Sequence, residues 1–216
     1  MLTLFGNLQS GNVHKVQMIL GTRRLPCRRV DVRQDRNEPR HPAFLKINPM
    51  GKVPALVLEN GDVLTESGAI LFYFAHNTPL WPDHLRGQTE VLRWMFFEQY
   101  SHEPALAVLR YLKLFSPSLP APAGRIAELM QKSQAVLDVL NRRLQLTAWI
   151  AGPRPTIADY ALYPYTKLAD EAGLQIANWP WILAWLRRVE SLPGVSPVYQ
   201  DAAVEVVTFD AYFRRP

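Results

Sequence analysis

The chain contains a single cysteine, Cys27, among its 216 residues. One cysteine excludes an internal disulfide, a Cys-x-x-Cys redox pair and any metal site that uses several thiolates. The five histidines are scattered without a pair at the spacing of helical metal ligands, so we expect no zinc site. The sequence therefore predicts a protein without a bound metal.

Long hydrophobic runs are also missing. The longest apolar run, Ala69 to Ala75, falls far short of the roughly 18 residues that a membrane span needs. The residues from Met1 to Phe5 lead directly into Gly6 without the basic and long apolar regions of a secretory signal. We therefore expect a soluble, cytoplasmic protein with no membrane partner.

The charge is modestly basic, with 24 Lys and Arg against 19 Asp and Glu, a net charge of +5. Such a balance suits nucleic acid, an acidic surface or small anionic ligands. Seven arginines crowd residues 23–40, but Asp31, Asp35 and Glu38 lie between them and no aromatic residue is present there to stack on bases. We interpret this stretch as a solvated face and expect no nucleic-acid partner.

The pattern along the chain changes near Pro82, which indicates two domains. Before it, Leu2–Phe5 reads as a strand, Ser10 or Gly11 starts a helix, and Cys27–Val32 reads as a second strand. A strand, helix, strand unit favours parallel pairing. An Asn60-Gly61 turn joins two further strands, and Ser67 is a natural cap for a helix over residues 69–75.

After a linker over residues 77–85 the sequence reads as helical throughout. The first helical stretch, 87–115, is expected to bend or break near Pro104 and to end at the cluster Pro117, Pro120 and Pro122. Thr156 and Asp159 have the spacing of a capping box that starts a helix. Further helices are expected over 123–146, 160–172 and 180–191.

Three segments of the first domain could form one site, because helix starts and strand ends gather at one edge of such a sheet. Ser10-Gly11-Asn12 can bind an anion through main-chain N–H groups and polar side chains, although Ser10 could equally be a simple helix cap. Glu66-Ser67 offers a hydroxyl and amide for a carboxylate and an acid for an ammonium, which suits an amino-acid head group, although a plain cap is the alternative.

The third segment is Asn48-Pro49-Met50-Gly51-Lys52-Val53-Pro54-Ala55-Leu56. A cis Val53-Pro54 bond could turn the main-chain N–H and C=O of Val53 outward to pair with an extended peptide-like ligand. An ordinary trans proline at a strand start is the alternative.

These segments, together with Thr156-Ile157-Ala158-Asp159, resemble the glutathione transferase family in order and approximate spacing over nearly the whole chain. The resemblance implies an α/β plus all-α fold, with a thioredoxin-like N-terminal domain over residues 1–78 and an all-helical C-terminal domain over 86–216. Family members usually dimerise, so a homodimer is expected.

The resemblance also implies residue roles. Glu66 and Ser67 would bind the γ-glutamyl end of glutathione, Val53 before Pro54 would pair with the cysteinyl main chain, and Lys52 would approach the glycine carboxylate. Either Arg40 or His41 could share that last role. No Tyr or Cys occurs near the first helix start and Cys27 lies too late, so the pattern looks most like bacterial members in which Ser10 and Asn12 would meet the sulfur.

The expected activity is conjugation of glutathione, as co-substrate, to a small apolar electrophile. The second substrate would lie against the helical domain near Tyr100, His102 and Tyr111, because an apolar pocket must come from there. Two alternatives stay open at this point: a glutathione-dependent disulfide reductase, and a non-catalytic interaction module of the same fold.

Overall fold

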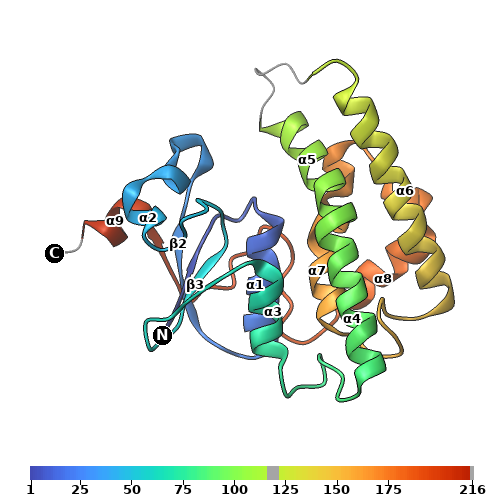
Figure 1. Ribbon diagram of the computed structural model, residues 1–216, viewed down its shortest axis with the longest axis horizontal. Helices are drawn as coiled ribbons and strands as arrows, with labels where there is room; N and C mark the ends of the chain where they lie inside the picture. The colour runs from blue at the N-terminus through green and yellow to red at the C-terminus, as the bar shows by residue number, and fades with distance from the viewer. Residues whose placement is uncertain (116–121, 215–216) are drawn as a thin grey trace. The chain divides into compact units, whose positions relative to one another are not determined.

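A computed structural model describes residues 1–115 and 122–214, which divide into two compact units (Figure 1). Unit 1 contains Met1–Phe74 and Leu192–Pro216, and unit 2 contains Ala75–Ser191. The expected boundary therefore needs a correction at the C-terminus, because the residues after 191 belong to the first unit rather than to the helical one. Pro117 and Pro120 lie outside the described residues.

Unit 1 is built on a mixed five-stranded sheet. Its strands, in the spatial order β4-β3-β1-β2-β5, are β4 (Val63–Thr65), β3 (Ala55–Val57), β1 (Leu2–Phe5), β2 (Cys27–Asp31) and β5 (Glu205–Thr208). Strand β2 runs parallel to both β1 and β5, whereas β3 runs antiparallel to β1 and β4. The predicted parallel pair and hairpin are confirmed, and β5 is an addition that the sequence did not predict.

Helices cover both faces of this sheet. Figure 1 shows α1 (Gly11–Thr22) and α3 (Ser67–Ala75) on one side, with α2 (Pro42–Leu45) and α9 (Phe209–Phe213) on the other. Two short 3₁₀ turns, η1 (Gln34–Arg36) and η2 (Glu38–Arg40), connect β2 to α2.

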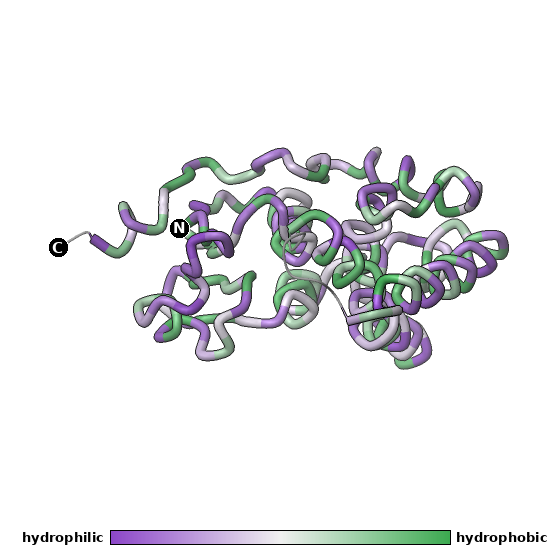
Figure 2. Tube along the Cα trace, turned by 90° about the horizontal axis from the view of Figure 1, so that it is seen from above, coloured by the Kyte–Doolittle hydropathy of each residue, from purple (hydrophilic) through white to green (hydrophobic). Residues whose placement is uncertain are grey.

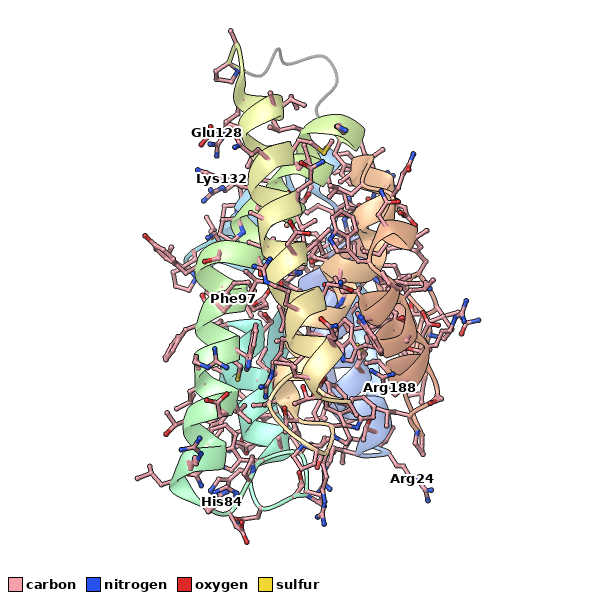
Figure 3. The ribbon with its side chains drawn as sticks, turned by 90° about the vertical axis from the view of Figure 1, so that its right-hand side faces the viewer. Arg24, His84, Phe97, Glu128, Lys132 and Arg188 are labelled. Atoms are coloured by element: carbon pink, nitrogen blue, oxygen red, sulfur yellow. The ribbon has the colours of Figure 1, made fainter. Side chains whose placement is uncertain are left out.

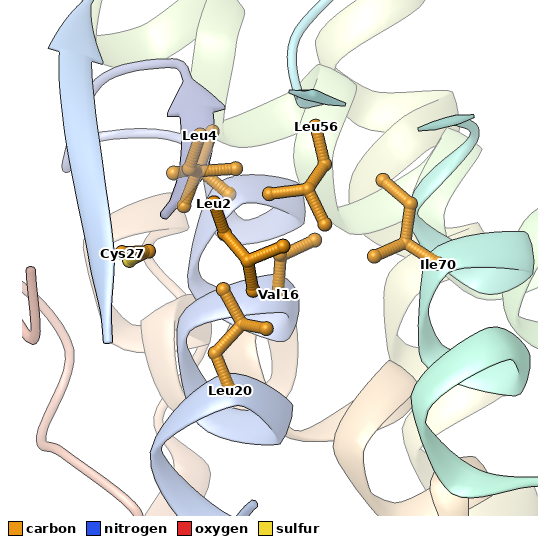
Figure 4. Packing of buried hydrophobic residues seen from close by; sticks show 8 residues of the cluster. Leu2, Leu4, Val16, Leu20, Cys27, Leu56 and Ile70 are labelled. Atoms are coloured by element: carbon orange, nitrogen blue, oxygen red, sulfur yellow. The ribbon is translucent and has the colours of Figure 1, made fainter. Parts of the chain in front are cut away.

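Alternation of side chains along the strands gives each face its own core. Between the sheet and the pair α1 and α3 lies a buried cluster (Figure 4): Leu2, Leu4, Val13, Val16, Leu20, Cys27, Leu56 and Ile70. The opposite face carries a second cluster: Phe5, Val30, Val32, Phe44, Ala55 and Phe209. Because Phe209 comes from α9, the end of the chain is part of the second core.

Unit 2 is helical within the part of the chain that the structure describes. It contains α4 (Leu85–Phe97), the π-helical turn η3 (Glu98–His102), α5 (Glu103–Leu114), α6 (Arg125–Leu146), α7 (Ile157–Lys167), η4 (Leu168–Ala172), η5 (Ile176–Asn178) and α8 (Pro180–Glu190). The π-turn ends at His102, two residues before Pro104, which is the second residue of α5. The helical stretch is not broken near this proline, because helical residues run without a gap from Leu85 to Leu114; the π-turn just before the proline is the irregularity found there.

The predicted capping box holds the start of α7. The Asp159 carboxylate, which is fully buried, accepts hydrogen bonds from the main-chain N–H groups of Thr156 and Ile150, both at 2.9 Å. It also accepts a 2.9 Å bond from the indole N–H of Trp185 on α8. Asp159 therefore ties the loop before α7 and the helix α8 to one buried point.

The outer face of unit 2 is solvated. On α6 the Glu128 carboxylate pairs with Lys132 at 2.6 Å and Arg125 at 2.8 Å, and Figure 3 shows Glu128 and Lys132 near one end of that helix. Figure 2 shows hydrophilic and hydrophobic residues alternating along the helices, as amphipathic packing requires.

No helix within residues 1–115 and 122–214 has the length and apolar character needed to cross a bilayer.

Candidate functional site

The turn between β1 and α1 is held by a set of main-chain and side-chain hydrogen bonds. Gly6 has a φ of +155°, and a side chain there would collide with Val13, so only glycine fits. The N–H of Gly6 donates to the Val30 carbonyl at 3.0 Å, and the Asn7 side chain donates to the Val32 carbonyl at 2.9 Å. These contacts hold the turn that leads into Ser10 against strand β2.

Ser10 is the N-cap of α1. Its hydroxyl oxygen accepts from the main-chain N–H of Val13 at 3.4 Å. The expected cap is therefore present, and it is compatible with the anion-binding role, because a hydroxyl that accepts one hydrogen bond still has its own hydrogen to donate. The first turn of α1 contains no acidic residue that would oppose an anion.

The starts of α1 and α3 meet at this turn. The Ser67 hydroxyl and the side-chain oxygen of Asn12 are 3.5 Å apart. The structure thus brings together two of the three segments expected to form the site. Ser67 is buried and is the first residue of α3, rather than the cap of a helix that starts at Ala69, as the sequence suggested.

Glu66 occupies the cap position in its place. Its carbonyl accepts from the Ile70 N–H at 3.0 Å, and its φ is +64°. A glutamate in the left-handed region is an outlier, since a residue with a Cβ pays a steric cost there that glycine avoids. Strained backbone of this kind gathers at ligand sites. The conformation leaves the Glu66 side chain exposed beside the free N–H groups of the helix start.

The third segment leads into β3. The Val53-Pro54 bond is cis, as considered from the sequence. Buried Asn48 shapes the loop before it, because its side chain donates to the Lys52 carbonyl at 2.7 Å and accepts from the Met50 N–H at 3.1 Å. Among the hydrogen bonds of the described residues, none uses the main-chain N–H or C=O of Val53.

Basic side chains lie near this loop. Arg40 and Lys52 are exposed, and neither has an acidic partner within the described residues. A Cβ placed on Gly51 would lie 3.1 Å from the Arg40 guanidinium, so Arg40 lies against the residue next to Lys52. His41 is exposed and caps α2, with its Nδ1 accepting from the Ala43 N–H at 3.2 Å. Arg40 and His41 are the two candidates to bind the glycine carboxylate together with Lys52. Of these two, Arg40 is the one that lies against Gly51.

Cys27 cannot supply a reactive sulfur to this site. It is buried in the cluster between the sheet and α1, and burial raises the pKa of its thiol to about 11. A thiol with that pKa is protonated at neutral pH and is a poor nucleophile. The described residues also hold no group of three His, Cys, Asp or Glu side chains that could ligate a metal.

The structure does not gather the three residues expected to bind the second substrate. Tyr100 is 88% exposed and Tyr111 is 46% exposed, whereas His102 is fully buried. The Nε2 of His102 lies 2.8 Å from the Thr166 hydroxyl of α7, which gives it a packing position inside the helical unit. The role of the two tyrosines stays a prediction.

Sequence reasoning missed the C-terminal contribution to this region. The Arg29 guanidinium on β2 donates to the Gly6 carbonyl at 2.7 Å and to Asp201 at 2.8 Å, and the ring of Phe209 lies 5.2 Å from that of His41. The β-branched run Val206-Val207-Thr208 is a strand signal that could have been noticed. The site of interest is therefore built from three stretches of the N-terminal half and supported by the last residues.

Known proteins resemble this chain over most of its length. The N-terminal domain model of glutathione S-transferases matches residues 4–82, and the C-terminal domain model matches residues 123–188. The disulfide-bond oxidoreductase YfcG of Escherichia coli K12 is 30% identical over 190 residues, which cover 85% of this chain and 87% of YfcG.

Solved structures agree with these matches. A glutathione S-transferase from Pseudomonas fluorescens Pf-5 is 39% identical with a TM-score of 0.86, over 92% of this chain and 99% of that one. Ure2p in complex with S-p-nitrobenzylglutathione is 25% identical with a TM-score of 0.81, over 90% and 92% of the two chains. With both domain models matched in order, this chain belongs to the glutathione S-transferase family.

Proposed function

We propose that the protein is a glutathione transferase that joins the thiolate of glutathione to small apolar electrophiles. The observation that carries the proposal is the approach of Asn12 to Ser67 within 3.5 Å, which places two anion-binding helix starts side by side. One start suits a thiolate and the other an α-amino-acid carboxylate. Relatives bind glutathione derivatives, as the Ure2p complex with S-p-nitrobenzylglutathione illustrates.

Each part of the tripeptide has a partner in this proposal. Glu66 pairs with the ammonium of the γ-glutamyl group, while the Ser67 hydroxyl and amide hold its carboxylate. The unpaired main chain of Val53, before Pro54, takes the cysteinyl main chain in extended pairing. Lys52, with Arg40 or His41, neutralises the glycine carboxylate.

The thiolate is stabilised by the start of α1. A free thiol has a pKa near about 8.5, so lowering it by about two units needs roughly 2.7 kcal/mol. A hydrogen bond to a charged sulfur contributes about 1.5 to 3 kcal/mol and a helix N-terminus about 0.3 to 1 kcal/mol. Donation by the Ser10 hydroxyl with assistance from the Asn12 amide is therefore sufficient.

The chemical step forms one bond and breaks one. The sulfur lone pair attacks an electrophilic carbon to form a C–S bond, and the leaving group departs with its electron pair. With 1-chloro-2,4-dinitrobenzene the products are the thioether and chloride. The apolar electrophile would contact the helical unit, where Tyr100 and Tyr111 expose aromatic surface.

A disulfide reductase is the second candidate, and the 30% identity to YfcG favours it. Because Cys27 is buried with a raised pKa, the reacting sulfur would again come from glutathione. Two glutathione molecules would then reduce one disulfide to two thiols and leave as glutathione disulfide. This reaction uses the same thiolate site but needs no apolar pocket.

Parallel assays distinguish the candidates. Turnover of 1-chloro-2,4-dinitrobenzene above that of 2-hydroxyethyl disulfide supports the transferase, and the reverse ratio supports the reductase. Calorimetry with glutathione alone tests both enzymatic candidates, because each of them requires glutathione binding. A protein that does not bind glutathione would favour the third alternative, a non-catalytic interaction module of this fold. Under either enzymatic proposal the protein works as a cytoplasmic homodimer in detoxification or thiol metabolism, since glutathione keeps cytosolic thiols reduced.

A further inference from the structure

The last part of the chain forms a strap on unit 1, defined here as Gln200–Phe213. It contains β5, which pairs in parallel with β2 from Arg28↔Glu205 to Asp31↔Thr208, and α9, which lies beside α2 (Figure 1). These residues lie beyond the two matched domain models, which cover residues 4–82 and 123–188.

Asp201 at the start of the strap binds the buried Arg29 side chain, which is 5% exposed. The Nε of Arg29 donates to Asp201 at 2.8 Å, while its Nη1 donates to the Gly6 carbonyl at 2.7 Å and to Asp31 at 2.6 Å. One guanidinium thus joins the strap directly to the first residue of the turn that leads to Ser10.

Asp201 also reaches the helix on the other side of that turn. Its second carboxylate oxygen accepts from the Gln17 side chain on α1 at 2.9 Å. Asp201 therefore binds groups on both sides of the Gly6–Ser10 turn. On one side it binds Arg29, which in turn binds the Gly6 carbonyl, and on the other it binds Gln17 of α1.

The aromatic end of the strap packs close to the same turn. The rings of Tyr212 and Phe213 lie 5.1 and 6.1 Å from the ring of Phe5, the residue before Gly6. The strap thus reaches the end of β1 in two ways: through the polar contacts of Asp201 and Arg29 with Gly6, and through aromatic contacts with Phe5.

We propose that Asp201, acting through Arg29, is a positioning residue that sets the geometry of the Gly6–Ser10 turn and so the thiolate-binding strength of Ser10 and Asn12. Its effect on glutathione rests on the function proposed above. The physical reason is that a buried guanidinium needs its carboxylate partners, and loss of one leaves it to reorganise around Asp31 and the Gly6 carbonyl. Hydrogen bonds to a thiolate depend steeply on geometry, so a small shift of the turn changes the pKa of the thiol.

The test compares Asp201→Ala with Glu205→Ala. Both remove one carboxylate from the strap, but Glu205 pairs with Arg28 at 2.7 Å, and within residues 1–115 and 122–214 Arg28 forms no hydrogen bond or ion pair with the Gly6–Ser10 turn. In the absence of glutathione, hydrogen exchange of the residue 6–10 amides is expected to rise about tenfold in Asp201→Ala and to stay unchanged in Glu205→Ala. With glutathione bound, the thiol pKa should rise by about one unit in the first variant only.

The two readouts keep this proposal separate from the proposed function. Exchange that rises equally in both variants, or in neither, overturns the positioning role whether or not the protein binds glutathione. If the wild-type protein does not bind glutathione, the proposed function is wrong, and so is the expected change in the pKa of the glutathione thiol. The hydrogen-exchange result still decides whether Asp201 positions the turn. Should Asp201→Ala not fold, Asp201→Asn, which keeps an acceptor but loses the charge, is compared with Glu205→Gln by the same measurements.

Discussion

At the scale of single residues, Ser10 combines a structural and a chemical role. Its oxygen caps α1 by accepting from Val13, and its hydrogen remains to be donated to a sulfur. The two roles can be separated by substitution, because the cap needs only an acceptor whereas the thiolate needs a donor.

We expect Ser10→Ala to raise the pKa of bound glutathione by about one to two units, since a hydrogen bond to a charged sulfur is lost. Asn12→Ala should give a smaller rise. Ser10→Thr is the matched control, because it keeps the hydroxyl. The pKa is measured from the ultraviolet absorbance of the thiolate as a function of pH in the saturated complex. An unchanged value in Ser10→Ala would remove Ser10 from the mechanism.

Glu66 shows a conflict between stability and binding. Its left-handed backbone is a conformation that glycine adopts without cost. We expect Glu66→Gly to stabilise the protein by about 1 kcal/mol in urea unfolding and to weaken glutathione binding about tenfold in calorimetry.

Glu66→Gln serves as its control, because glutamine keeps the backbone strain and removes only the charge. It should weaken binding without raising stability. A Glu66→Gly protein that binds glutathione as tightly as the wild type would show that the acid has no part in the site.

At the scale of elements, α1 carries a buried histidine that should make unit 1 sensitive to acid. Burial lowers the pKa of His14 from 6.5 to about 4. Between these two values the unfolded chain takes up a proton that the folded chain does not. The free energy of unfolding should therefore fall by about 3 kcal/mol as the pH drops from 6.5 to 4.

Urea unfolding at a series of pH values measures this slope, and His14→Gln, which does not titrate, should flatten it. Equal slopes in the two proteins would mean that other groups cause the acid sensitivity.

The elements also show how far a sequence alone determines this fold. Local signals sufficed where the cause is local: the Asn60-Gly61 hairpin and the capping box of Thr156 lie where predicted, and a π-turn precedes Pro104 where a bend or break was expected. Helix α3 starts two residues earlier than expected, because Glu66 takes a cap conformation that residue preferences do not favour. The site segments stay a prediction, and each of them opens a helix or a strand.

What could not be predicted depends on distant partners. Strand β5 is short, and its partner β2 lies 177 residues earlier in the chain, as the pair Arg28↔Glu205 shows. The burial of His102 follows from its contact with Thr166, which no local pattern reveals. Pairing over such separations is set by the assembled core rather than by the residues of either segment.

At the scale of the whole molecule, the proposed homodimer needs an exposed apolar surface. Leu92 and Phe96 lie four residues apart on α4, and they are 40% and 68% exposed. On α3, Phe72 and Tyr73 are also exposed. Apolar surface that recurs along one helix face is typical of an interface.

We therefore expect the wild-type protein to sediment as a dimer and Phe96→Glu to shift it toward a monomer, because a charge buried in an apolar interface is costly. Leu146→Glu is the control, since Leu146 is 79% exposed and lies on a different helix, at the end of α6. Far-ultraviolet circular dichroism of both variants should stay unchanged. A wild-type protein that sediments as a monomer at micromolar concentration would contradict the interface.

The parallel strand contributed by residues 205–208 has a consequence for the order in which the protein matures. Unit 1 is interrupted in the chain by the whole of unit 2, so its sheet lacks one edge until the ribosome has passed residue 208. Unit 2, by contrast, is continuous and can assemble during translation. Completion of the sheet, and with it the Asp201 contact to Arg29, accordingly follows the synthesis of unit 2, and a chain terminated before β5 would expose the open edge of β2 to other nascent chains.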